Sequence, residues 1–184
     1  MEGRKKVTIA YFIPLWTQAH LARWAENFVH YLNHEKYSVS FVGVKIEESF
    51  SREIAKNISV VSLENAYIAG TFLKIVAYFI KEKPDIFMSN APHISVMSLV
   101  AKIITRSKTK IFITEHNNVS LLVNNIKNPF RRLIGKFILL HLMNLSYPLA
   151  DVITCVSKGV ANDLSRIIDN KKKIHVVYDP VTND

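Results

Sequence analysis

K-I-F-I-T-E-H-N-N, residues 110–118, is the stretch that decides the fold and points to a site. It begins as a short apolar run typical of a buried strand, Ile111 to Ile113, and ends in the polar side chains of Thr114 to Asn118. In an open parallel sheet, ligands collect at the carboxyl ends of the strands. The stretch therefore predicts a site at this end, although polar residues after a strand also serve simply to cap local backbone groups.

Apolar runs alternate with helical patterns along the whole chain. The runs of strand composition are Lys6–Ile13, Val39–Val44, Ile58–Leu63, Asp85–Met88, Ile111–Ile113, Asp151–Val156 and Ile174–Tyr178. The segments of helical periodicity are Ala19–Asn33, Gly70–Lys81, Ile94–Thr105, Phe130–Ser146 and Gly159–Ile168. Uniformly apolar strands separated by helices are typical of a parallel sheet with both faces covered. We predict an α/β, Rossmann-like domain with a parallel sheet of about seven strands and helices on both faces.

Composition indicates one globular domain. The chain has 184 residues, of which 49% are apolar and 21% charged. The single cysteine, Cys155, excludes a disulfide within the chain and a cysteine-based metal site, which suits a reducing, cytoplasmic compartment. The charged N-terminus does not fit a signal peptide, and the apolar stretch Phe137–Ala150 is too short to cross a bilayer. We expect a domain over residues 1–178, and residues 179–184 as the start of a linker.

The net charge is +9, and much of the excess falls between Lys102 and Lys136, where eight Lys or Arg stand against one acid, Glu115. We expect one strongly positive region, which attracts phosphates, nucleic acid or an anionic membrane. Arg131, Arg132 and Lys136 lie on an apolar helical pattern, so this helix faces either a membrane surface or solvent. No basic ladder interleaved with aromatic residues, and no helix-turn-helix pattern, supports a nucleic-acid partner.

Three other turns offer candidate residues. Trp16, Thr17 and Gln18 follow the first strand without a G-x-G-x-x-G or P-loop, which argues against a dinucleotide cradle. Thr17 or Gln18 could donate to an anion or cap the helix. Asn90 and His93 follow another strand on the expected ligand side, or are ordinary first-turn residues. Ser157 opens a helix and is either its cap or a phosphate ligand.

Four stretches, in order and at the expected spacing, resemble the N-terminal domain of GT-B fold glycosyltransferases, the retaining family 4 or group 1. They are Val7–Leu32, Lys83–Pro92, Ile113–Asn117, and Ala150–Val160 with His175–Val181. Two details depart from the family pattern. Trp16–Ala19 replaces a pair of glycines in the first turn, and Asp179 replaces an asparagine before proline. The family's paired donor-site glutamates belong to a C-terminal domain that this sequence lacks.

The resemblance implies a hexosyl-type glycosyltransferase as part of a longer chain. It would transfer sugar from a nucleotide-sugar to a lipid- or polymer-linked glycan acceptor in bacterial surface polysaccharide biosynthesis. His116 would be catalytic, in the cleft between two domains. Donor- or acceptor-binding residues would be Trp16, Thr17, Gln18, Asn90, His93, Glu115, Asn117 and Ser157.

The resemblance also implies partners and a location. The partners would be the C-terminal domain of the same protein and possibly an anionic membrane surface at the inner face of the cytoplasmic membrane. No cofactor is expected, and no metal, because the chain has no D-x-D carboxylate pair. The alternative is a non-catalytic, Rossmann-like binding module that docks on a membrane or partner through its basic face.

Overall fold

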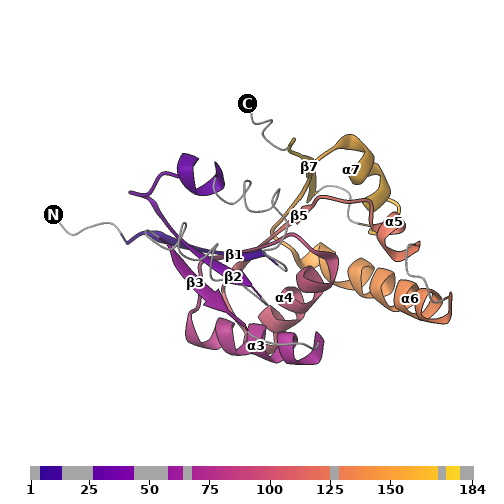
Figure 1. The fold of residues 1–184 in the computed structure, drawn as a ribbon, viewed down its shortest axis with the longest axis horizontal. Coiled ribbons are helices and arrows are strands. Elements are labelled where there is room, and N and C mark those ends of the chain that lie inside the picture. The colour runs from indigo at the N-terminus through magenta and orange to yellow at the C-terminus, as the bar shows by residue number, and fades with distance from the viewer. Residues whose placement is uncertain are drawn as a thin grey trace. The chain divides into compact units, whose positions relative to one another are not determined.

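The computed structural model describes residues 5–13, 27–43, 58–63, 68–124, 129–169 and 173–178 (Figure 1). The chain divides into two compact units, each with its own strands. The first comprises Met1–Ser89 and Ala101–Lys110, and the second comprises Asn90–Val100 and Ile111–Asp184. Each unit is described by itself.

The first unit is built on parallel strands in the order β3-β2-β1-β4. Their bounds are β1 Val7–Ile13, β2 Tyr37–Gly43, β3 Ser59–Ser62 and β4 Ile86–Ser89. The helix α3, Ile68–Lys81, runs beneath these strands in Figure 1. A second helix, α4, Pro92–Thr105, ends in this unit after beginning in the other.

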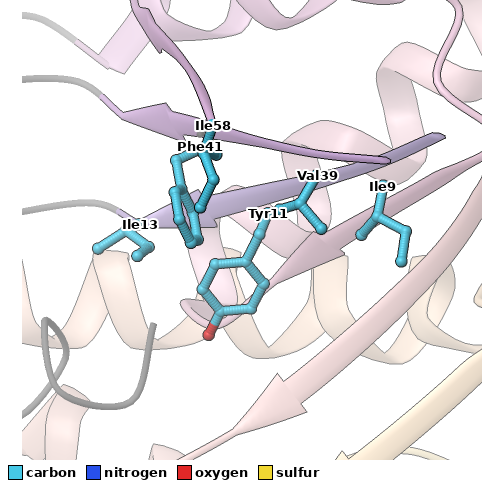
Figure 2. Packing of buried hydrophobic residues seen from close by; sticks show 6 residues of the cluster. All are labelled: Ile9, Tyr11, Ile13, Val39, Phe41 and Ile58. Carbon is cyan, nitrogen blue, oxygen red and sulfur yellow. The ribbon is translucent and has the colours of Figure 1, made fainter. Parts of the chain in front are cut away.

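Both faces of the first unit's strands β1 and β2 are buried over most of their length. Figure 2 shows one face, where alternate residues of neighbouring strands gather: Ile9, Tyr11, Ile13, Val39, Phe41 and Ile58. Phe28 of the helical residues 27–31 packs against this cluster, its ring 5.8 Å from that of Tyr11. On the other face, Phe79 of α3 meets Phe87 of β4 edge-on at 5.0 Å. Burial on both faces explains why these strands read as continuous apolar runs rather than as alternating ones.

The second unit has the parallel strands β5, Lys110–Glu115, β6, Val152–Cys155, and β7, Ile174–Val176, in that order. Its helical elements are α5 Val119–Asn124, α6 Pro129–Ser146, the 3₁₀ turn η1 Tyr147–Leu149, and α7 Lys158–Leu164. The described part of the chain thus has seven strands, all parallel to their neighbours within each unit.

The prediction of a Rossmann-like α/β fold with about seven parallel strands is confirmed. Two elements differ from the sequence prediction. The polar stretch before Pro129, predicted as loop, contains α5. The helix predicted over Gly159–Ile168 ends earlier, at Leu164, and Ser165 is its C-cap residue. The predicted linker residues 179–184 lie outside the described residues.

Candidate functional site

The last residue of β5, Glu115, is buried. Its side chain is 1% exposed, and the Tyr147 hydroxyl, itself fully buried, donates a hydrogen bond of 2.5 Å to its Oε1. A buried carboxylate is costly unless it is paired or protonated, and here burial raises the pKa of Glu115 to about 7, although the Tyr147 bond works in the opposite direction. At neutral pH the carboxyl group therefore holds its proton about half of the time.

Two neighbours of Glu115 stay protonated. Burial, reinforced by Glu115, holds the pKa of Tyr147 well above its usual value. Cys155 stands opposite Glu115 in the β5–β6 register, and burial, followed by the charge of Glu115, raises its pKa to about 12. The Cys155 thiol is therefore a poor nucleophile at neutral pH. Its role in this site is packing.

Tyr147 also connects the end of β5 with the start of α4. The Ser95 hydroxyl can donate its single proton either to the Tyr147 oxygen or to the carbonyl oxygen of Ala91, which lies 3.0 Å away. Tyr147 therefore links Glu115, at the end of β5, to Ser95 on α4.

Polar atoms are buried where β5 ends. They include Nε2 of His116 and Oδ1 of Asn118, and Oδ1 of Asn90, which follows β4, is also buried. Oδ1 of Asn118 has no hydrogen-bond partner among the described residues. An unsatisfied buried acceptor costs about 1–3 kcal/mol, so a donor from a ligand would be favourable at this atom.

Asn118 is free to present this oxygen because another residue caps α5. The Asn118 carbonyl oxygen accepts from the backbone of Leu121 and Leu122, which makes Asn118 the residue before the helix. Asparagine at that position ordinarily caps the helix with its side chain. Instead, the Ser120 amide donates to Oδ2 of Asp163, on α7, at 3.0 Å. The sequence alone does not show that the Asn118 side chain is left uncapped, because Asp163 lies 43 residues from Ser120.

Comparison with known proteins assigns the family. The family model described as Glycosyltransferase Family 4 matches residues 21–184. The chain belongs to glycosyltransferase family 4. The predicted resemblance to the N-terminal domain of family 4, GT-B fold enzymes is thereby confirmed. No curated protein matches the sequence of this family 4 chain.

Solved structures share the fold of this family 4 chain. An apo lipopolysaccharide outer core galactosyltransferase WaaB is 15% identical, with a TM-score of 0.67, over 97% of this chain and 47% of its own. Anabaena Alr3699/HepE in complex with UDP-glucose is 13% identical, with a TM-score of 0.63, over 95% and 44%. A UDP-N-acetylglucosamine 2-epimerase is 13% identical, with a TM-score of 0.58, over 94% and 48%. The chain spans less than half the length of these proteins, and at such identities they show the fold alone.

Three other predicted binding residues of the family 4 chain, Ser157, His93 and Asn117, lie on different segments. Ser157 caps α7, its Oγ accepting from the Val160 amide at 3.2 Å, as the simpler of its two interpretations predicted. His93 is exposed on the first turn of α4, and partial loss of water around its ring lowers its pKa. Asn117 is exposed. Trp16, Thr17 and Gln18 lie outside the described residues. Ligand binding by each of these residues stays a prediction.

The helix α6 carries the predicted membrane-facing residues Arg131, Arg132 and Lys136. Its exposed apolar side chains are Leu133, Phe137, Ile138, Leu142 and Leu145. Lys136 reaches back to α5, where its Nζ donates to Oδ1 of Asn124 at 3.2 Å. Within the described residues, no helix combines the length and apolarity that a bilayer-spanning segment needs. The described residues also bring together no group of three or more metal-ligating side chains.

Proposed function

We propose that this chain supplies the acceptor side of an enzyme that transfers a hexosyl sugar from a nucleotide-sugar to a lipid- or polymer-linked glycan. The observation that carries the proposal is the family 4 match over residues 21–184. HepE, which shares the fold, is described in complex with UDP-glucose, and this supports a nucleotide-sugar donor. We assign the product to bacterial surface polysaccharide, by analogy with the galactosyltransferase WaaB.

The polar groups at the end of β5 would orient the reacting sugar. His116 follows the buried Glu115 directly, so the Glu115–Tyr147 hydrogen bond fixes the backbone from which the imidazole projects. Nε2 of His116 and Oδ1 of Asn118 are buried atoms that suit sugar hydroxyl groups. Glu115 is already bonded to a phenol, so it is better suited to position His116 than to bind a ligand directly. The grip on the donor pyrophosphate would come from a second domain, and residues 1–184 alone would be inactive.

We propose that α6 places the enzyme on the inner, anionic face of the cytoplasmic membrane. Helices with an apolar face and basic residues lie at such interfaces. The exposed apolar residues of α6 occupy about half of the helix surface, at an advance of about 100° per residue. The basic residues Arg131, Arg132 and Lys136 share that helix. A lipid-linked acceptor would be reached from this location.

The role of His116 is tested in the full-length enzyme. We expect His116→Ala to lower kcat by about 100-fold or more, the scale of a positioned catalytic side chain. Its unfolding midpoint should change little, because the residue is partly exposed at a strand end. The matched control is His175→Ala, at an exposed histidine of β7. Normal transfer by His116→Ala would reject the proposed site, whereas loss of folding with retained specific activity would identify a structural histidine.

A further inference from the structure

The first unit has a second candidate site, a hollow of about 940 Å³ at the amino ends of its strands. β1, β4 and β5 all begin in its wall, at Val7, Ile86 and Lys110. The candidate transfer site follows the carboxyl end of β5, five residues further along the same strand. The hollow is lined by residues of the first unit, whereas the candidate transfer site belongs to the second unit. The hollow is therefore a separate feature.

Six cations line this hollow, from three segments of the chain: Lys5, Lys6, Lys83, Arg106, Lys108 and Lys110. None of the six forms an ion pair within the part of the chain that the structure describes. The one carboxylate in the lining, Asp85, accepts hydrogen bonds at 2.8 Å from the Thr8 amide and from the Thr8 hydroxyl. Those two bonds, with a smaller contribution from Lys5, lower the pKa of Asp85. One carboxylate cannot balance six cations.

The backbone that carries these cations is held by hydrogen bonds between the three segments. The Asp85 amide donates back to Oγ1 of Thr8 at 2.9 Å, which joins the start of β1 to the start of β4. The Lys110 amide donates to the carbonyl oxygen of Asp85 at 2.9 Å. The Thr109 hydroxyl donates to the carbonyl oxygen of Pro84 at 2.7 Å. A fixed frame therefore keeps mutually repelling charges around one hollow.

Two of the cations occupy positions that favour glycine. Lys83 follows α3 with φ of 46°, and Arg106 follows α4 with φ of 51°. At Arg106 the helix closes with bonds from the Arg106 amide to Ile103 and from the Ser107 amide to Lys102, the pattern in which glycine is usual. Cations also suit the negative end of a helix dipole. That explanation does not extend to Lys5 and Lys6, which precede β1, or to Lys110, which begins β5.

We propose that this hollow binds a small, soluble, multivalent phosphate anion of the pyrophosphate class. A compact polyanion relieves the repulsion among the cations and accepts hydrogen bonds from ammonium and guanidinium groups. Ser107 and Thr109 hydrogen-bond each other, with 2.7 Å between their hydroxyl oxygens, so recognition depends on the cations. Long exposed lysines select charge density rather than shape. The hollow therefore favours pyrophosphate over monovalent anions and over neutral sugars.

The test is isothermal titration of the 184-residue chain with inorganic pyrophosphate at low salt. We expect saturable binding that weakens steeply as salt is added, because exposed charges are screened. Arg106→Gln with Lys108→Gln should weaken it at least about fivefold, and so should Lys5→Gln with Lys6→Gln. The matched control removes two exposed cations elsewhere, Lys74→Gln with Arg166→Gln, and should change the affinity less than about twofold. Circular dichroism checks that each variant is folded.

Three results would overturn the proposal. The first is absence of pyrophosphate binding at millimolar concentration. The second is that the two double variants of the hollow and the control double variant weaken pyrophosphate binding equally. This result would indicate that binding depends only on the overall charge of the chain. The third is a chain that binds vesicles of phosphatidylglycerol but not pyrophosphate, with the vesicle binding abolished by the double variants at Lys5 and Lys6 or at Arg106 and Lys108. This result would indicate a lipid surface. None of these results bears on sugar transfer, since His116 is unchanged in every variant.

Discussion

The hydroxyl of Tyr147 donates a 2.5 Å hydrogen bond to Oε1 of Glu115, and both side chains are buried. This bond joins the end of β5 to η1, and through Ser95 to the start of α4. The acceptor in this bond is a carboxyl group whose pKa burial raises to about 7. Small changes of pH near neutrality alter the charge at this point.

Glu115 should make the protein less stable as pH rises from about 4.5 to about 7. In that range the unfolded state releases the proton that the folded state keeps, because the pKa of Glu115 is about 7 in the fold and 4.5 in its ordinary state. The loss should reach about 3 kcal/mol above pH 7. Glu115→Gln, whose amide carries no charge, should remove this part of the pH dependence. Urea unfolding of both proteins at pH 5 and pH 8 measures it, and equal slopes would show that Glu115 titrates normally.

Tyr147→Phe should destabilise the fold more at pH 8 than at pH 5. At pH 8 the change leaves a buried carboxylate without its donor, which costs about 1–3 kcal/mol. At pH 5 Glu115 is protonated in the fold and depends less on that donor. The control is Tyr78→Phe, since the Tyr78 hydroxyl is hydrogen-bonded to a neutral group, the Ser40 hydroxyl, at 3.1 Å. A loss for Tyr147→Phe that does not vary with pH would contradict the coupling.

The strands β1 and β2 could be predicted from sequence because burial on both faces favours nearly continuous apolar runs. The predicted Lys6–Ile13 and the observed Val7–Ile13 differ by one residue. The sequence also places polar residues after β5, yet it does not show that Glu115 is inside the fold. That depends on Tyr147, 32 residues away. The cap of α5 depends likewise on Asp163, 43 residues from Ser120.

The prediction of one strongly positive region stays a prediction, since the cations counted along the chain fall in two compact units. Arg106, Lys108 and Lys110 line the hollow of the first unit, together with lysines from Lys5 to Lys83. Arg131, Arg132 and Lys136 belong to α6, in the second unit. Two basic features therefore need separate explanations, one as an anion site and the other as a membrane surface.

Arg131→Gln, Arg132→Gln and Lys136→Gln together should weaken binding to anionic vesicles. Each cation near such a surface contributes about 1 kcal/mol, so three correspond to roughly 100-fold. The effect should fade as salt is added. Sedimentation of vesicles with and without phosphatidylglycerol measures it, and the control is the triple variant at the exposed Lys74, Lys158 and Arg166. Equal effects of the two triples would leave α6 as a solvated helix.

Asp163→Asn should lower stability by about 0.5–2 kcal/mol, the value of a helix cap. The Asp163 carboxylate accepts from Ser120 at the start of α5, where a negative charge is also favoured by the helix dipole. Asp169→Asn, at an exposed aspartate, serves as the control. Amide hydrogen exchange should locate the loss at Leu121 and Leu122. Unchanged exchange in α5 would mean that Asp163 does not hold this helix.

Asn118→Ala should separate stability from function. Because Oδ1 of Asn118 is buried without a hydrogen-bond partner among the described residues, removing it should leave the unfolding free energy unchanged or raise it by up to about 1 kcal/mol. Transfer by the full-length enzyme should fall, with kcat/KM about 3- to 10-fold lower, if a ligand hydroxyl donates to this oxygen. Asn117→Ala, at the exposed neighbour, gives the matched comparison. If Asn118→Ala lowers the free energy of unfolding and leaves kcat/KM normal, the oxygen serves the fold. An acceptor kept for a ligand should instead lower the stability of the native enzyme while raising its kcat/KM.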